Sequence, residues 1–214
     1  MFALAVLAGL LAQTVLAEQL TCGNSDAQTA PLRSPAGFTV LLRMHSEDDH
    51  GRNTHLCMAD YTIEATRPDG TAAKPDQFIS SDGEWSRSLT FRIDGFSKDG
   101  NIAYAYIADG SPPTLNAEAY DLRTGTSLGV FVDLGFAKRL DSACAATVHI
   151  FGILPTGQMV LATTAGGSCH HPSYWVLRPS RNSGKSGGQL PERPSLLPSD
   201  AGVTPLDPGK PVAR

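Results

Sequence analysis

Apolar and polar residues alternate with a period of two through most of this chain. In residues 38–44 every second side chain is apolar, from Phe38 to Met44, which places these side chains on one face of a strand. After residue 17 no stretch keeps helical spacing over three turns. The pattern predicts an all-β domain of antiparallel strands. The expected strands are Phe38–His45, Met58–Arg67, Leu89–Phe96, Ile102–Ala108, Ala117–Arg123, Ala146–Leu154, Met159–Thr164 and Tyr174–Arg178.

Three segments of the chain follow one plan. Each has a turn that ends in glycine, an apolar strand, a loop and a second strand that ends in arginine. The turns are Ser34–Gly37, Ser97–Gly100 and Leu154–Gly157, and the second strands end at Arg67, Arg123 and Arg178. The near-equal spacing of both series predicts three similar structural units.

The second segment contains Phe96-Ser-Lys-Asp-Gly-Asn-Ile-Ala-Tyr-Ala-Tyr, followed by Ala119-Tyr-Asp-Leu-Arg-Thr-Gly. It resembles one blade of the WD40-like or TolB-type β-propeller repeats, in which an F-S-x-D-G turn leads into an inner strand. The resemblance covers Phe96 to Gly125 well and the other two segments loosely. It implies three propeller-blade-like units in an incomplete propeller or a sandwich-like stack, because closed propellers usually have four or more blades. Those families mostly serve as interaction platforms, so the resemblance implies binding.

The two ends of the chain differ in composition from the middle. Residues 1–17 form an apolar run that is too short to span a bilayer, and small residues precede Glu18. We expect a signal peptide that is cleaved before Glu18, although no Lys or Arg precedes the run as is usual in such peptides. The alternative is a membrane anchor, which the length of the run disfavours. Residues 179–214 are rich in Pro, Gly and Ser, which predicts a disordered tail whose removal changes the melting temperature by less than about 2 °C. Residues 18–178 then form the all-β domain.

The four cysteines are even in number and none lies in a CxxC pair, which favours two disulfides in the periplasm or outside the cell. Folding a hairpin between Thr156 and Gly157 places Cys144 opposite Cys169 and leaves Cys22 to pair with Cys57. The formal net charge is −4, and the negative excess lies in the domain. This charge disfavours nucleic acid as a partner, and we expect no membrane contact after leader cleavage.

Residues 45–55 are the most polar stretch of the domain, and their imidazoles and carboxylates could hold a divalent metal ion. The candidate ligands are His45, Asp48, Asp49, His50, His55 and His171. The alternative is a solvated hairpin loop, because the spacing matches no established zinc or calcium loop.

Asp82, Glu84 and Trp85 form a turn in which the indole could anchor a partner, or pack over the edge of the core instead. The sequence contains no G-x-S-x-G, S-x-x-K or H-E-x-x-H motif. It therefore predicts an exported, non-catalytic binding or scaffold domain, without a cofactor, for a protein or polysaccharide partner. The alternative is a metal-binding protein or metal-assisted hydrolase that uses His45, His50 and His55.

Overall fold

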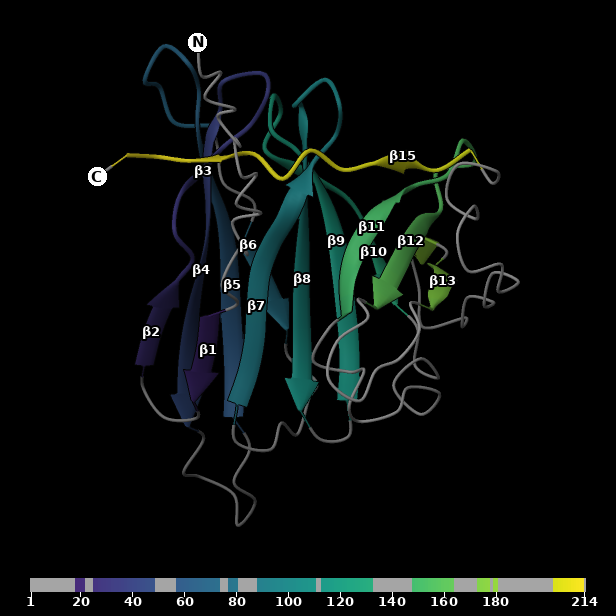
Figure 1. The fold of residues 1–214 in the computed structure, drawn as a ribbon. Helices are drawn as coiled ribbons and strands as arrows, with labels where there is room; N and C mark the ends of the chain where they lie inside the picture. The colour runs from purple at the N-terminus through teal and green to yellow at the C-terminus, as the bar shows by residue number, and fades with distance from the viewer. Residues whose placement is uncertain are drawn as a thin grey trace, which may run out of the picture.

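The computed structural model describes residues 18–21, 25–48, 57–73, 77–80, 88–110, 113–132, 148–163, 173–177, 179–180 and 202–213. These residues contain no helix, and hence none that could cross a membrane. Their strands form three antiparallel sheets (Figure 1). The all-β class expected from the alternation of residues is confirmed.

The first sheet, here the N-terminal sheet, has the strand order β16-β3-β4-β5-β6, and β2 also pairs with β4. Its strands are β2 (Ser25–Gln28), β3 (Leu32–Arg33), β4 (Thr39–Asp48), β5 (Cys57–Thr66), β6 (Gln77–Ser80) and β16 (Lys210–Pro211). Strands β4 and β5 pair over their full length, from Thr39 opposite Thr66 to Asp48 opposite Cys57. Val40, Leu42 and Met44 are completely buried, as the alternation predicts.

The second sheet, here the middle sheet, has the order β1-β7-β8-β9-β10-β14, and the third, here the C-terminal sheet, has the order β13-β12-β11-β15. The middle sheet contains β1 (Glu18–Thr21), β7 (Ser88–Phe96), β8 (Ile102–Gly110), β9 (Pro113–Asp121), β10 (Thr126–Val132) and β14 (Pro179–Ser180). The C-terminal sheet contains β11 (Val148–Ile153), β12 (Met159–Thr163), β13 (Tyr174–Leu177) and β15 (Thr204–Pro205).

Each of the three similar sequence segments lies in a different sheet, as β3-β4-β5, β7-β8-β9 and β11-β12-β13. The turn between the first two strands of each set is closed by the amide of its glycine. Gly37, Gly100 and Gly157 donate to the carbonyls of the residues three positions before them at 2.9, 2.7 and 2.8 Å. All three glycines have positive φ values, a conformation that side chains disfavour, which explains the recurring glycine.

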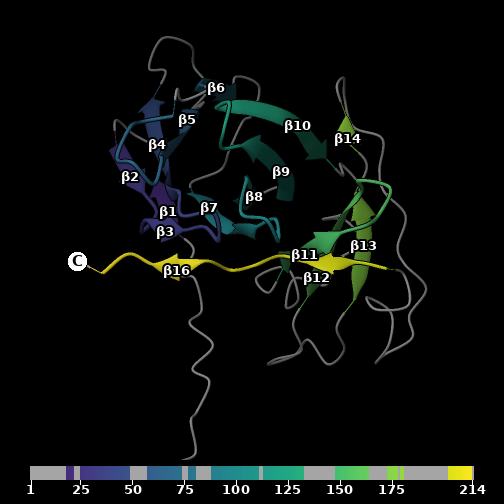
Figure 2. The same ribbon diagram turned by 90° about the horizontal axis from the view of Figure 1, so that it is seen from above.

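The middle sheet is buried on both faces. Along β8, Ala103 and Ala105 join the core shared with the N-terminal sheet, whereas Tyr104 and Tyr106 join the core shared with the C-terminal sheet. Small residues thus alternate with aromatic ones because each face of one strand meets a different neighbour. The three sheets therefore form layers, with the middle sheet between the other two (Figure 2).

The hairpin of β11 and β12 forms at the expected turn, but with a different register. The predicted register would place Ile150 opposite Thr163, whereas Ile150 pairs with Leu161. The register thus differs from the predicted one by two residues at Ile150. The irregularity between Ile150 and Gly152 accounts for one of them, and the turn between Ile153 and Met159 accounts for the other. The predicted pairing of Cys144 with Cys169 depends on the predicted register, and both cysteines lie outside the described residues.

The end of the chain differs from the disordered tail that its composition predicts. Residues 202–213 run in extended form across the three sheets, and Figure 1 shows this segment in yellow at one end of the strands. Thr204 and Pro205 pair with β11, and Lys210 and Pro211 pair with β3. The composition of the segment alone predicts no fixed conformation, and its backbone hydrogen bonds to β11 and β3 hold it in place.

Candidate functional site

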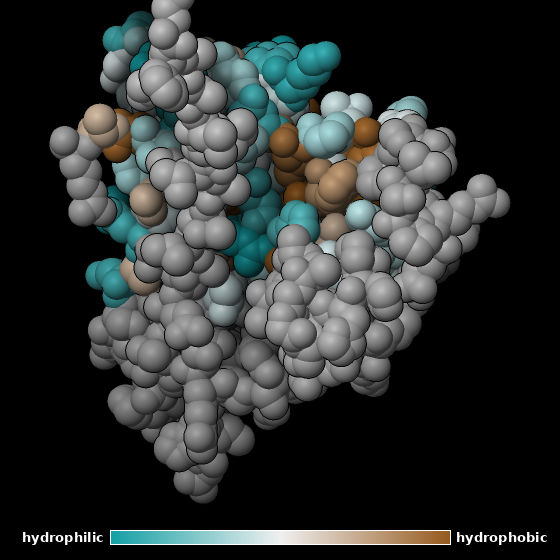
Figure 3. All heavy atoms as spheres, in the orientation of Figure 1, coloured by the Kyte–Doolittle hydropathy of each residue, from teal (hydrophilic) through white to brown (hydrophobic). Residues whose placement is uncertain are grey.

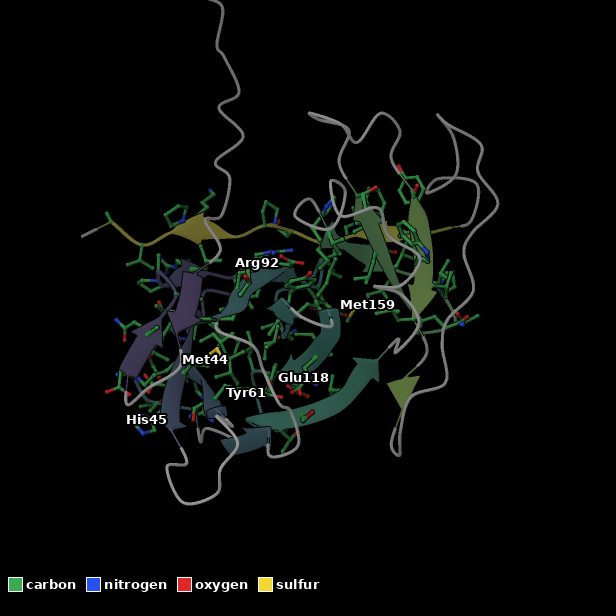
Figure 4. All side chains as sticks on the ribbon, turned by 90° about the horizontal axis from the view of Figure 1, so that it is seen from below. Met44, His45, Tyr61, Arg92, Glu118 and Met159 are labelled. Atoms are coloured by element: carbon green, nitrogen blue, oxygen red, sulfur yellow. The ribbon has the colours of Figure 1, made fainter. Side chains whose placement is uncertain are left out.

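His45 lies on β4 and its ring contacts a carboxylate. Its Nδ1 atom is 2.6 Å from Oδ1 of Asp26 on the neighbouring strand β2, and both side chains are exposed (Figure 4). Asp48 ends β4. The other predicted ligands, Asp49, His50, His55 and His171, lie outside the described residues. Within the described ranges no three His, Cys, Asp or Glu side chains could hold a metal ion together, so the metal hypothesis stays a prediction.

The remaining predicted site residues fall mostly outside the described parts of the chain. Cys57 begins β5. The others, Cys22, Asp82, Glu84, Trp85, Cys144 and Cys169, are not among the described residues. The partner anchor and the disulfide pairing stay predictions.

A carboxyl group is buried between the N-terminal and middle sheets. Glu118 on β9 is 1% exposed, and its Oε1 accepts a hydrogen bond of 2.6 Å from the hydroxyl of Tyr61 on β5. Its Oε2 accepts a second bond of 2.6 Å from the hydroxyl of Tyr120. Figure 4 shows Tyr61 and Glu118 next to each other between the two sheets. The sequence reading missed this cluster, although Glu118 stands at an inward position of an alternating strand.

Burial sets the protonation of this cluster. Desolvation raises the pKa of Glu118 above its usual value, and the hydrogen bonds from Tyr120 and Tyr61 lower it by less. Desolvation also raises the pKa of Tyr61, and the nearby charge of Glu118 adds to this effect. All three side chains are buried, so the cluster joins two sheets and offers no surface to a ligand.

A second polar contact joins the middle sheet to the C-terminal sheet. Arg92 and Asp94 on β7 form an ion pair whose side chains are only 12% and 4% exposed. The Arg92 guanidinium also donates to the carbonyl of Val148, and the Asp94 Oδ2 accepts the amide of Ile150 at 2.5 Å. The guanidinium carbon lies 4.0 Å from the ring centroid of Tyr106. The two side chains thus bond to a carbonyl and an amide of β11, the same groups that the backbone of a neighbouring strand would bind.

The C-terminal segment contacts one strand of each sheet: β11, then the end of β7, then β3. Leu206 donates its amide to the carbonyl of Phe151 at 3.3 Å, next to β15 on β11. Asp207 exchanges two backbone hydrogen bonds with Phe96 at the end of β7, at 2.7 and 2.9 Å. Val212 donates to the carbonyl of Pro31 at 3.2 Å, beside β16 and β3. The segment therefore touches all three layers in turn.

Glycines make room for this close approach. A Cβ atom on Gly152 would lie 2.3 Å from the carbonyl oxygen of Thr204, and one on Gly95 would lie 2.7 Å from that of Asp207. On the segment itself, a Cβ atom on Gly209 would lie 2.5 Å from the ring of Phe96. These positions leave space for a polypeptide backbone where any other residue would push it away. We take the ends of β11, β7 and β3 that hold residues 203–212 as the candidate functional site, and call it the strap site.

Comparisons with known proteins give no match: none among protein-family models, curated proteins or solved structures.

Proposed function

We propose that this protein is an exported, non-catalytic binding or scaffold domain that holds a partner protein by an extended segment. The observation that carries the proposal is the strap site, where the folded sheets hold residues 203–212 through backbone hydrogen bonds. Extended segments that pair with sheet edges are a common mode of protein recognition. The resident segment supports an extended polypeptide as the ligand of the site.

The surface of the resident segment supports a binding role. Seven of the residues 203–213 are exposed, so most of its side chains contribute little to how it is held. Affinity from backbone bonds together with a few inward side chains allows different sequences to occupy the same site. Such tolerance suits a scaffold that meets several partners.

The sequence supports the compartment and the class of partner in this proposal. The apolar leader and the even number of cysteines favour a periplasmic or secreted protein. The resemblance of residues 96–125 to WD40-like or TolB-type blades points to interaction platforms. The net negative charge disfavours nucleic acid as the partner.

A peptide-display selection tests the proposal. The bait is the full-length protein with Leu206→Asn, which weakens the resident segment by placing a polar group where Leu206 packs on the core. We expect extended peptides to be enriched and to cross-link beside β11, β7 and β3. A folded bait that enriches no peptide contradicts the proposal. Binding on a glycan array in its place would assign the partner to polysaccharides.

A further inference from the structure

The inward residues of the C-terminal segment recur at every third position. Val203 is buried at 7% exposure, and Leu206, Gly209 and Val212 are half-buried. The residues between them are all exposed: Thr204, Pro205, Asp207, Pro208, Lys210 and Pro211. A period of three is neither that of a strand nor that of an α-helix, but it is that of the polyproline II helix.

Proline follows the same period and favours the same conformation. Pro205, Pro208 and Pro211 each have φ fixed by the ring, and the residue before each proline is biased toward the extended or polyproline II region. Between Thr204 and Pro211, only Leu206 and Gly209 lie outside these pairs. Gly209 has a φ of 73° where the segment passes the ring of Phe96, so the polyproline II run is interrupted there.

The period of the segment also matches the spacing of the layers. One turn of polyproline II advances about 9 Å, and packed sheets lie about 10 Å apart. The pairing positions agree with this match, because Thr204 and Pro205 meet β11, Asp207 meets Phe96 of β7, and Lys210 and Pro211 meet β3. Each further sheet is reached about three residues later. Figure 2 shows the yellow segment running along the side of the stack where β3, β7 and β11 lie.

The surface near this end of the sheets accommodates the apolar side chains of Val203 and Leu206, and at Gly209 it leaves room for backbone alone. Leu206 packs against the core shared by the middle and C-terminal sheets. In the view of Figure 3, apolar side chains gather on the upper part of the face, in the area of β11. Aromatic and apolar surfaces are the usual receptors for polyproline II segments.

We propose that the strap site is a receptor for polyproline II segments, which it reads at one residue in three with one turn per sheet. Residues 203–212 are its resident ligand, and the partner supplies a proline-rich segment with the same spacing. This inference rests on the proposed binding function and names the chemistry of the ligand. The residues that decide recognition are those at the positions of Val203, Leu206, Gly209 and Val212.

The test uses the full chain with a protease recognition sequence inserted among residues 181–201, folded first and then cut. Fluorescent peptides are added, and fluorescence anisotropy reports their binding to the cut protein. The probe has the sequence of residues 202–213. Three matched peptides serve as comparisons: Leu206→Asn at an inward position, Lys210→Gln at an outward position, and a permuted peptide of the same composition whose three prolines are contiguous.

We expect the Leu206→Asn and permuted peptides to bind at least about tenfold more weakly than the probe, and the Lys210→Gln peptide within about twofold. If the cut fragment stays bound through gel filtration, the same ranking is measured as the peptide concentration that displaces it. Equal binding of all four peptides would overturn the three-residue reading and leave the proposed binding function intact. No binding to a cut protein that keeps its β-sheet circular dichroism would overturn both. Loss of that spectrum on release of the fragment would also overturn the inference, because the site would not exist without its occupant.

Discussion

The hydroxyl of Tyr61 on β5 donates a 2.6 Å hydrogen bond to Glu118 on β9, and this bond crosses the interface between two sheets. Tyr120 donates to the other oxygen of the same carboxyl group. A buried acid with both oxygens bonded is tolerated in an apolar interface, but its ionisation there is costly. The stability of the fold should therefore depend on the protonation of Glu118.

Replacing Glu118 by Gln should change how stability varies with pH. Because burial raises the pKa of Glu118 in the folded protein, its contribution is fully present below the ordinary pKa of 4.5 and is lost as pH rises toward the folded-state value. Relative to E118Q, the wild type should lose up to about 1.4 kcal/mol of unfolding free energy per pH unit within that window. Urea unfolding of both proteins from pH 4 upward measures the difference. Glu64→Gln, which removes an exposed glutamate from β5, controls for the loss of one charge, and a pH-independent difference for E118Q would refute the burial argument.

Removing Asp94 should weaken the contact between the middle and C-terminal sheets. Asp94→Ala leaves the amide of Ile150 without its acceptor and Arg92 without its counter-charge, so we expect a loss of about 2–3 kcal/mol of unfolding free energy. Arg43→Ala is the control, since it breaks an ion pair with Glu64 in which both side chains are more than 40% exposed, and should cost less than about 1 kcal/mol. Chemical denaturation measures both variants. Similar losses in the two would show that the partly buried pair has no special role.

Deleting residues 202–214 should lower the melting temperature by about 5–10 °C. The segment makes several backbone hydrogen bonds and buries Val203, together worth about 2–3 kcal/mol, and a domain of this size loses roughly 2–4 °C per kcal/mol. The composition of the tail alone predicts a change below about 2 °C. Differential scanning calorimetry separates the two expectations. Lys210→Gln in the full chain, at an exposed position, should leave the melting temperature within about 1 °C.

Peptide mapping under non-reducing conditions should find Cys22 joined to Cys57 and Cys144 joined to Cys169. Both pairs stay predictions from the sequence, because Cys22, Cys144 and Cys169 lie outside the described residues. Any other connectivity, or four free thiols in the mature protein, would contradict this prediction.

The strands that alternate strongly could be predicted to within a few residues. The segments expected at 38–45, 159–164 and 174–178 correspond to β4, β12 and β13. In β4 and β13 one face is buried, so the alternation of apolar and polar residues follows the structure, whereas all five residues of β12 are buried and its continuous apolar run marks the strand. By contrast, β2 has the sequence Ser-Asp-Ala-Gln, whose place is set by pairing with β4 and not by any pattern of its own.

The candidate site was harder to predict for a physical reason. Inward residues every third position fit neither the strand period nor the helix period, and a high proline and glycine content indicates disorder when no partner surface is considered. The partner surface lies far away in sequence, on Phe96 and Gly152, and a single sequence does not reveal such pairings. The sequence gives only a weak indication that Glu118 is buried: it stands among Ala117, Ala119 and Tyr120 on a strand that is otherwise apolar there.

The pairing of Lys210 and Pro211 with Leu32 and Arg33 has a consequence for biosynthesis. This edge of β3 stays without its neighbour until the chain has been made as far as Pro211. A chain cut short before Lys210 would expose the edge, where proteases and chaperones could detect it. Residues 210–211 thus cover an edge that would otherwise be open to pairing with another chain.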